Sequence, residues 1–310
     1  KEDDIEASVG VQSLSRHATR VELRPRTTGF SALAAIPGIW LRESTPTDEV
    51  RMVLPRGSFD FRESVEYVHE GRRQLLAPVE LEAVVDQGNL LKMPANMSYE
   101  DGAAFTMTYG TFYYALKQRS SYKPGETLLV TGASGGVGLT AVELGALMGL
   151  KVIAAVGSDE KMEICRKYGA TMFVNYNKEK MRDKVKELTA GNGADIVYDA
   201  VGGDAFDESV RCIAWYGRIL VVGFAAGRIP SLPANLALLK SCDVRGVFYG
   251  AWRGREPAEA RKNFDELLKW YGEGKLKPHV SMRFPLEKGA EAMNALLSRK
   301  ATGKVVLTVA

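Results

Sequence analysis

The segment VTGASGGVGLTAVELGALMGLKVIAAVG, residues 130–157, constrains the fold more than any other part of the chain. An apolar run over 127–130 leads into a glycine-rich turn, the turn opens into an amphipathic helix, and a second apolar run follows over 152–156. A strand, a glycine turn and a helix in this order form half of a dinucleotide-binding unit. An ordinary glycine-rich turn is the alternative, but the second strand arrives at the expected interval and favours nucleotide binding.

The spacing of the glycines has a physical reason. Gly132, Gly135 and Gly138 follow the pattern G-x-x-G-x-x-G, with Gly136 between them. A turn under a pyrophosphate needs residues that tolerate positive φ, and it needs backbone without a Cβ where the phosphates approach. The helix that begins near Val137 points its free N–H groups and the positive end of its dipole at the phosphates. We therefore predict that residues 135–138 form a phosphate-binding loop.

The end of the second strand bears on the choice of nucleotide. NAD sites usually carry Asp or Glu there for the ribose 2′-OH, whereas NADP sites have a small residue and nearby cations. The strand ends at 156–158 without a carboxylate at its tip, and Lys161 follows one helical turn later. Ser158 can donate to a phosphate and can also cap the next helix. Asp159 and Glu160 keep NAD open, although in the first turn of a helix they complement its dipole and need not reach the ribose. We favour NADP(H).

Length and composition exclude several classes of protein. The chain has 310 residues, enough for two domains with sizeable cores. Its net charge of +3 predicts no special affinity for nucleic acid or membrane, and no apolar run approaches the ~20 residues of a membrane span. No signal peptide is recognisable, and the few, widely spaced cysteines and histidines predict a reduced, cytoplasmic protein without a metal site. These residues are Cys165, Cys212, Cys242, His17, His69 and His279.

Strands and helices alternate regularly from about residue 113. This alternation predicts an α/β domain with a doubly wound parallel sheet, covered by helices on both faces. A charged helix over 256–273, a short helix over 287–299 and a final strand over 303–309 belong to a second structural region. The predicted strands of the sheet are 127–131, 151–156, 172–175, 195–199, 218–223 and 244–249, and its predicted helices are 137–148, 159–168, 178–189, 204–214 and 233–240.

From about Val84 to its end, the chain resembles the zinc-free quinone oxidoreductases of the medium-chain dehydrogenase/reductase superfamily, and within them the quinone oxidoreductase-like proteins. The stretches that carry the resemblance stand in the family's order: DQGNLLKMPANMSYEDGAA (86–104), TYGTFYYAL (108–116), YKPGETLLVTGASGGVG (122–138), YGATMFVNY (168–176), DIVYDAVGG (195–203), GRILVVGFAAG (217–227) and ATGKVVL (301–307).

This resemblance implies a domain organisation. It places an NADP-binding Rossmann domain at 113–250, inserted into a GroES-like β-barrel domain made of 1–112 and 251–310. It implies a homodimer whose subunits pair through edge strands, here 244–249. It also implies NADP(H) as the cofactor and a site without a metal.

The resemblance further assigns residues around the cofactor. Residues 135–138 match the phosphate loop, that is Gly135, Gly136, Val137 and Gly138. Lys161 matches a lysine that binds the 2′-phosphate, Tyr176 a tyrosine beside the adenosine phosphate, and Lys304 a basic residue close to the cofactor. The residues assigned to the nicotinamide side are Thr111, Gly223, Phe224 and Phe248.

Residues 1–82 depart from the family pattern. A GroES-like half should contain G-x-N-x-x-D, P-G-x-E and G-D-x-V stretches, and none is intact. The segment holds ten arginines but only one lysine, whereas the later sequence mixes the two. A divergent domain, a fusion or a stretch translated in the wrong frame would each explain the switch near residue 83. Because the family's asparagine and tyrosine beside the nicotinamide come from this segment, we assign no catalytic residue.

Taken together, these features predict an NADPH-dependent oxidoreductase that transfers a hydride to a quinone or another small conjugated carbonyl compound, without zinc. Enoyl-thioester reduction on the same scaffold is the enzymatic alternative. A non-catalytic NADP-binding protein that acts through its surface is the alternative from another class, because a fold alone does not prove an activity.

Overall fold

The computed structural model describes residues 91–308 and, before them, the backbone of six short strands. These strands form three antiparallel pairs: β1 (Ser8–Ser15) with β2 (Ala18–Arg24), β3 (Val50–Val53) with β6 (Glu82–Val85), and β4 (Tyr67–His69) with β5 (Arg72–Gln74). The rest of residues 1–90 lies outside the described residues. The GroES-like domain that the resemblance implies falls largely on them and stays a prediction.

The chain separates into two compact units. The first comprises 1–93, 283–294 and 307–310, and the second comprises 94–282 and 295–306. All of the residues that the sequence assigns to the cofactor lie in the second unit. The predicted domain boundaries at 112 and 251 stay a prediction.

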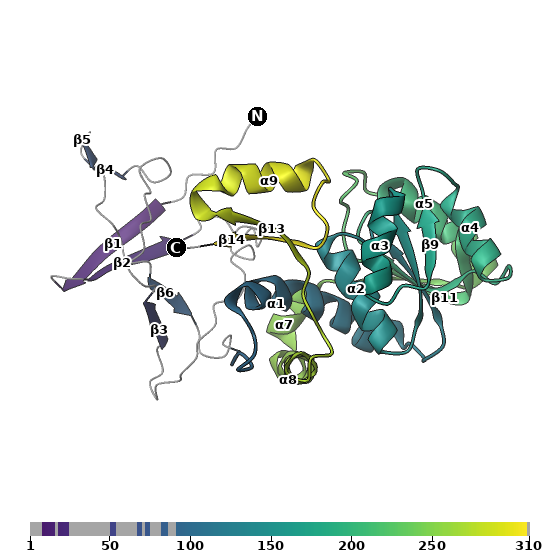
Figure 1. Cartoon of the computed structure of the whole chain (residues 1–310), viewed down its shortest axis with the longest axis horizontal. Helices are drawn as coiled ribbons and strands as arrows, with labels where there is room; N and C mark the ends of the chain where they lie inside the picture. The colour runs from purple at the N-terminus through teal and green to yellow at the C-terminus, as the bar shows by residue number, and fades with distance from the viewer. Residues whose placement is uncertain are drawn as a thin grey trace. The chain divides into compact units, whose positions relative to one another are not determined.

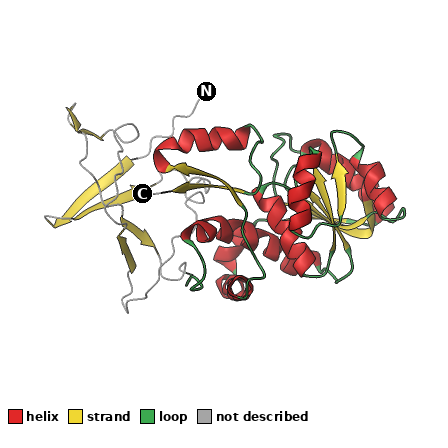
Figure 2. Cartoon of the chain, viewed as in Figure 1, coloured by secondary structure: helices red, strands yellow, loops and turns green. Residues whose placement is uncertain are grey.

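A six-stranded sheet forms the centre of the second unit (Figures 1 and 2). Its strands lie in the order β12-β11-β10-β7-β8-β9, and all neighbours are parallel. The strand order reverses between β7 and β10, so the predicted doubly wound sheet is confirmed, and ligands of such sheets bind at the carboxyl ends of the strands near this reversal. The strands are β7 (Thr127–Thr131), β8 (Lys151–Val156), β9 (Met172–Asn175), β10 (Ala194–Asp199), β11 (Ile213–Val221) and β12 (Asp243–Gly246).

Helices cover both faces of this sheet (Figure 2). On one face, Leu129, Ile153 and Val197 pack with residues of α4 and α5 into a fully buried cluster. On the other face, Phe112 of α1 contacts Tyr198 edge to face, with ring centroids 5.0 Å apart. The helices are α1 (Tyr99–Tyr114), which continues as a π-helical stretch (Ala115–Ser120), α2 (Gly136–Leu147), α3 (Asp159–Lys167), α4 (Met181–Leu188), α5 (Gly203–Cys212), α6 (Ala234–Lys240), α7 (Tyr249–Arg255) and α8 (Pro257–Gly272).

After α8, two segments of the chain lie near the glycine turn at 132–138. The first precedes β13 (Val280–Pro285), and the second precedes β14 (Lys304–Thr308), which pairs with β13. Between these strands lie a single 3-10 turn (Leu286–Lys288) and α9 (Gly289–Leu297).

The predicted edge strand 244–249 is too long. Strand β12 ends at Gly246, and Val247 makes the last contact with β11, from its N–H to the carbonyl of Val221 at 2.9 Å. The backbone of Phe248 then leaves the extended region, with φ −106° and ψ 73°, and α7 begins at Tyr249. A buried Trp252 one turn later explains why the chain turns inward here instead of extending the edge.

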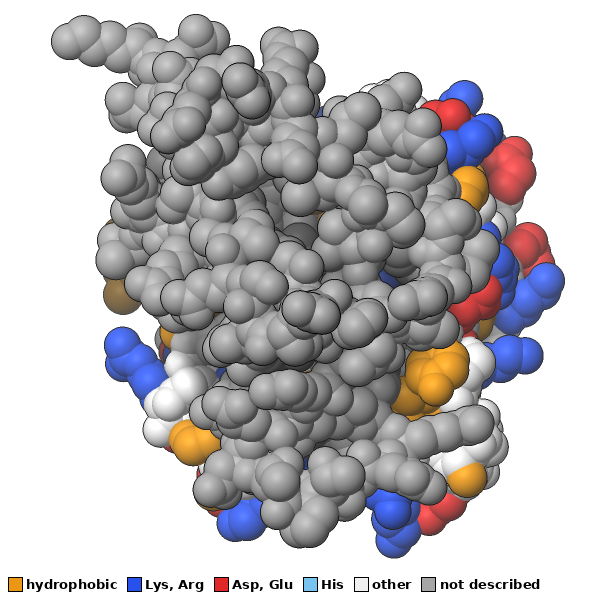
Figure 3. All heavy atoms as spheres, turned by 90° about the vertical axis from the view of Figure 1, so that its left-hand side faces the viewer, with side chains coloured by type: hydrophobic (Ala, Val, Ile, Leu, Met, Phe, Trp, Pro, Cys, Tyr) orange, Lys and Arg blue, Asp and Glu red, His pale blue; other side chains and the backbone are white. Residues whose placement is uncertain are grey.

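The surface of the described residues carries both signs of charge. Figure 3 shows Lys and Arg side chains interspersed with Asp and Glu along the rim of the view. Within residues 91–308 and the six earlier strands, no helix is both long enough and apolar enough to cross a membrane. The same residues contain no group of three or more His, Cys, Asp or Glu side chains arranged to hold a metal ion.

Candidate dinucleotide-binding site

The glycine turn joins the carboxyl end of β7 to the first turn of α2. Gly132 has a φ of +62°, and the N–H of Gly135 donates to its carbonyl at 3.0 Å, which closes the turn. Gly135 is the N-cap residue of α2, with extended backbone. The amides in the first turn of a helix have no partner within the helix and point along its axis. The amides of residues 136–138 are therefore available to an anion at this end of α2.

Position 138 has no room for a side chain. A Cβ at this position would lie 2.3 Å from the carbonyl oxygen of Gly132 and 2.8 Å from the Cα of Ala133. Both are backbone atoms of the turn itself, so the contact cannot be relieved by a side-chain rotation. The first turn of α2 can lie this close to the loop only because position 138 has no side chain.

The segment before β14 lies against the same turn. The N–H of Gly303 donates to the carbonyl of Ser134 at 2.8 Å, and Gly303 pairs with Gly135 as an isolated β-bridge. A Cβ on Gly136 would meet the Cδ of Lys304 at 2.9 Å. Lys304, which the sequence assigns to the cofactor, is therefore beside the predicted phosphate loop. Burial lowers the pKa of its ammonium group, and no ion pair to that group occurs among residues 91–308.

A second group of residues gathers where β8 ends. The Nζ of Lys161 donates to the carbonyl of Arg299 at 3.0 Å. A Cβ on Gly157 would lie 3.2 Å from the hydroxyl of Tyr176, so that this ring covers the strand end. Burial raises the pKa of Tyr176, and the positive charge of Arg299 opposes that rise. Lys161 and Tyr176 thus each interact with Arg299 near the end of β8, and their role toward the cofactor stays a prediction.

Arg299 is the residue at this end that the sequence reasoning missed. It lies 138 positions after Lys161 and has a positive φ of 56°, just beyond α9. No spacing rule links it to β8. The one sequence feature that could have pointed to Arg299 is its position two residues before the stretch 301–307, which carries the family resemblance.

The carboxylates next to the strand end are engaged elsewhere. Asp159 accepts from the Nδ2 of Asn175 at 2.7 Å and forms an ion pair with Lys178, and these hydrogen bonds, that from Lys178 foremost, lower its pKa. The carboxylate of Glu160 accepts from the hydroxyl of Ser158, and this bond is the main reason for its lowered pKa. Ser158 is the N-cap residue of α3, but its hydroxyl does not bond the helix backbone. The hydrogen bonds of Asp159 therefore run toward the end of β9.

Where the strand order reverses between β7 and β10, a buried carboxylate fixes the loops that follow the strands. Asp199, at the end of β10, accepts from the hydroxyl of Thr131 at 2.6 Å and from the N–H groups of Val201 and Gly202 at 3.1 and 3.2 Å. Its backbone carbonyl accepts from the N–H of Val222, just beyond β11, at 2.8 Å. Asp199 thereby ties together the ends of three neighbouring strands, which is a structural role.

The four residues assigned to the nicotinamide side occupy different positions. A Cβ on Gly223 would lie 3.3 Å from the carbonyl oxygen of Ala200, and Phe224 is 42% exposed beside it. Thr111 is buried within α1, and its hydroxyl donates to the carbonyl of Met107 at 2.6 Å. Phe248 is 69% exposed at the start of α7. In the described part of the chain, no hydrogen bond joins Thr111 or Phe248 to residues 223–224, and their role at the nicotinamide stays a prediction.

Comparisons with known proteins find similarity over the same part of the chain. The zinc-binding dehydrogenase family matches residues 136–271. The quinone oxidoreductase-like protein 2 homolog of Nematostella vectensis is 45% identical over 228 residues, which are 73% of this chain, and the chain covers only 62% of that protein. The quinone oxidoreductase-like protein 2 of Bos taurus is 38% identical over 303 residues, 94% of this chain and 85% of that protein.

Among solved structures, the Escherichia coli quinone oxidoreductase complexed with NADPH matches with a TM-score of 0.68 and 28% identity. The match covers 78% of this chain and 77% of that one.

Proposed function

Because the chain belongs to the quinone oxidoreductase-like proteins of the medium-chain dehydrogenase/reductase superfamily, we propose that it is an oxidoreductase that uses NADPH to reduce a quinone or another conjugated carbonyl compound without a catalytic metal. The observation that carries this proposal is the glycine turn at the carboxyl edge of the sheet with Lys304 beside it, which we interpret as part of a cradle for a dinucleotide. The cradle has a phosphate loop in the middle and a basic group of residues at the end of β8.

The residues of the cradle fit a dinucleotide. The amides of Gly136, Val137 and Gly138 would hold the pyrophosphate, and the half-buried Lys304 beside them would balance its charge. A cation left without a partner in a half-buried place is costly unless an anion joins it. Binding of an anion at the first turn of α2 would remove that cost.

The end of β8 supports NADPH over NADH. Lys161 bonds the carbonyl of Arg299, and the charge of Arg299 acts on Tyr176, so both cations belong to the group at the end of β8, where a 2′-phosphate would lie. Asp159, the nearest candidate for a ribose 2′-OH, is committed to Asn175 and Lys178. The site therefore offers positive charge, and its nearest carboxylate is already engaged, which is an arrangement that favours a phosphate.

The bound nicotinamide would supply the hydride, and the chain would bind, orient and shield it. Gly223 would let the loop after β11 approach the ring, with Phe224 as an apolar neighbour. A quinone needs little help from a protein acid, because the negative charge of its product spreads over its own ring. This fits a site to which we assign no general acid.

We also propose a homodimer that pairs through the edge strand β12, at 243–246 rather than 244–249. This strand is the outermost of the sheet next to β11, and an unpaired edge is a template for a second strand. Leu238 and Leu239 on the preceding α6 are 76% and 64% exposed, and they would extend such an interface. Size-exclusion chromatography with light scattering tests this proposal.

A substrate panel tests the proposed reaction. Turnover of quinones or enones with NADPH, measured by the loss of absorbance of the reduced cofactor, is the expected result. Turnover confined to enoyl thioesters would instead indicate an enoyl reductase. Tight NADPH binding, measured by cofactor fluorescence, without turnover of any member of the panel would contradict an enzymatic role.

We expect Lys161→Ala to weaken the binding of NADPH far more than that of NADH. Loss of a charge-assisted bond to the 2′-phosphate costs about 1.5–3 kcal/mol, while NADH has no such phosphate. Titration calorimetry with both cofactors measures the difference. Lys269→Ala removes an exposed lysine of α8 and serves as the matched control, with unchanged affinity for both. An equal loss for NADPH and NADH in Lys161→Ala would contradict the 2′-phosphate role.

A further inference from the structure

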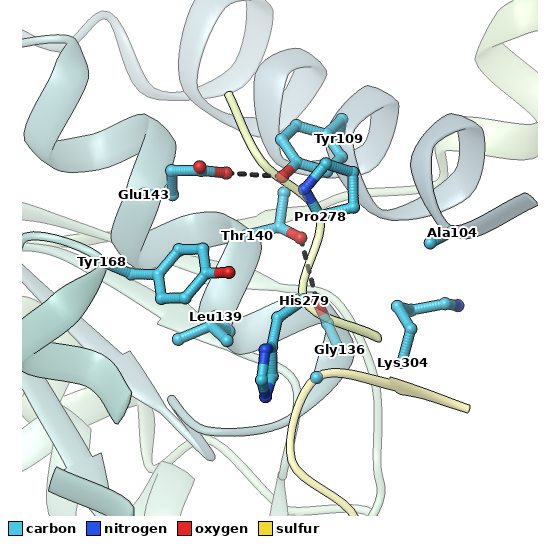
Figure 4. A pocket seen from close by; sticks show the side chains of 11 residues that line it. Ala104, Tyr109, Gly136, Leu139, Thr140, Glu143, Tyr168, Pro278, His279 and Lys304 are labelled. Carbon is cyan, nitrogen blue, oxygen red and sulfur yellow. Dashed lines mark hydrogen bonds between the residues drawn. The ribbon is translucent and has the colours of Figure 1, made fainter. Parts of the chain in front are cut away.

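A polar pair on the side of α2 links three elements of the second unit. Glu143 lies about one and a half turns after the phosphate loop, and its carboxylate faces a pocket lined also by Thr140, Tyr168 and Lys304 (Figure 4). The hydroxyl of Tyr109, in α1, donates to its Oε2 at 2.5 Å. The backbone N–H of Lys277, in the segment before β13, donates to its Oε1 at 2.8 Å. The carboxylate therefore bridges α1, α2 and this segment.

The held segment leads to the phosphate loop by short steps. Two residues after Lys277, the carbonyl of His279 accepts from the N–H of Lys304 at 2.7 Å. A Cβ on Gly303 would lie 2.4 Å from that same carbonyl oxygen, so the two segments pack without space between them. Gly303 in turn donates to Ser134 in the glycine turn. A continuous series of backbone contacts thus runs from Lys277 through His279 to Lys304.

The surroundings of Glu143 make its charge sensitive to pH. Burial raises its pKa to about 7, although the hydrogen bonds from Tyr109 and from the N–H of Lys277 oppose the rise. No ion pair to this carboxylate occurs among the described residues. The other titratable groups around it are Tyr168, whose pKa burial raises to about 12, and His279, whose pKa is lowered by burial and by Lys167. Lys304 lines the same pocket, and Asp101 acts on Tyr109 and Tyr168.

Protonation changes both bonds of the bridge. The ionised carboxylate accepts from Tyr109 and from Lys277, and bonds to an ionised acceptor are roughly twice as strong as neutral ones. A proton on Oε2 reverses the bond to Tyr109, because the carboxyl O–H then donates and the phenol oxygen accepts, and this bond also loses its charge assistance. The bond from Lys277 to Oε1 then loses its charge assistance as well. The segment before β13 is held less firmly in the protonated state.

We propose that Glu143 is a positioning residue, which through the segments 277–279 and 302–304 couples its own protonation state to the placement of Lys304 beside the phosphate loop. This proposal rests on the proposed function, because its consequence is a pH-dependent affinity for the dinucleotide. The ionised form holds Lys304 in place, so the affinity falls as the pH falls through neutrality.

The test compares the pH dependence of NADPH and NADH binding in the wild type, Glu143→Gln and Tyr109→Phe between pH 5.5 and 8.5. The 2′-phosphate of NADPH titrates in this range, but it does so equally with every variant, and NADH lacks it. As the pH falls across this range, we expect the affinity of the wild type for both cofactors to drop about three- to tenfold more than the affinity of Glu143→Gln does. Gln keeps an oxygen for Lys277 but does not titrate. Glu187→Gln, an exposed change in α4, should behave like the wild type.

Tyr109→Phe supplies the readout that a purely structural role would not move. It removes a bond that lowers the pKa of Glu143, so the midpoint of the affinity transition should move to higher pH. If Glu143→Gln does not fold, this variant still decides. An unmoved midpoint, or the same pH dependence in Glu143→Gln as in the wild type, overturns the proposal.

Hydrogen exchange of the Lys277 amide in the free protein separates the possible failures. Protection that weakens below neutral pH in the wild type but not in Glu143→Gln supports the bridge. If the protection follows this pattern but the affinity for NADPH and NADH does not change with pH, the coupling is overturned and the proposed function stays intact. Absence of dinucleotide binding in every variant overturns both.

Discussion

Replacing Arg218 by Met is expected to lower the free energy of unfolding by about 3–5 kcal/mol, because it breaks a buried ion pair and leaves its partner unpaired. Arg218 in β11 is only 8% exposed. Its guanidinium holds both carboxylate oxygens of Glu126, with Nη2 to Oε2 at 2.7 Å and Nη1 to Oε1 at 3.1 Å. It also donates to the carbonyls of Ser120 and Asp195, at 2.8 and 3.2 Å. Methionine fills part of the space but satisfies none of these acceptors.

The environment of Glu126 makes this effect depend on pH. Burial alone would raise its pKa, yet the hydrogen bonds and charge of Arg218, with a bond from the N–H of Lys123, lower it. The stabilisation by this carboxylate is therefore present above its pKa in the unfolded chain and is lost as the pH falls through the lower pKa of the folded state. Arg218→Met should consequently cost less in acid than at pH 7.

Denaturant unfolding measures the effect. Lys262→Met breaks an exposed pair with Glu259 and serves as the control, with an expected change below about 1 kcal/mol. Adding Glu126→Leu to Arg218→Met removes the stranded charge and should recover part of the loss. A loss below about 1 kcal/mol for Arg218→Met itself would show that the pair is not a buried one. Cofactor affinity should stay unchanged in the folded variant, because Arg218 lies near the amino end of β7 and the phosphate loop at its carboxyl end.

The parts of the fold that were predictable from sequence are those with local causes. The bounds of β7, β8 and β9 agree with the predicted strands, because each is a short apolar run bounded by turn residues. The glycine turn was predictable for the same reason. Its conformation is dictated by missing side chains within seven residues, and the positive φ of Gly132 and the close contact of Gly138 follow from that spacing.

The parts that escaped prediction depend on tertiary contacts. Helix α1 is buried on most of its surface, so it lacks the polar face that makes a helix visible in a sequence, and only the cap formed by Ser98 on the N–H of Asp101 marks its start. Arg299 reaches Lys161 only after the chain has folded back from α9. Glu143 looks like an ordinary surface residue of an amphipathic helix until α1 and the segment before β13 cover it.

The glycine at position 138 makes the sharpest prediction about the site. We expect Gly138→Ala to weaken the binding of both NADPH and NADH by at least a hundredfold. The new Cβ would lie 2.3 Å from the carbonyl oxygen of Gly132, far inside any tolerated contact. That oxygen accepts the bond from Gly135 that closes the turn, so its displacement opens the turn and misdirects the amides that would hold the pyrophosphate. Titration calorimetry with both cofactors measures the loss.

A second glycine of the same helix separates this effect from crowding in general. A Cβ on Gly145 would meet the Cδ2 of Leu128 at 2.6 Å, which is the movable end of a side chain, and Gly145 lies about two turns from the loop. We expect Gly145→Ala to lower the free energy of unfolding by about 1–3 kcal/mol, as overpacking does, while the affinity for either cofactor stays within about twofold. Gly138→Ala should lower stability by a similar amount but lose the cofactor. If instead both variants bind NADPH as the wild type does, the turn at 132–138 is not the phosphate site, and the basic residues near it must serve another ligand.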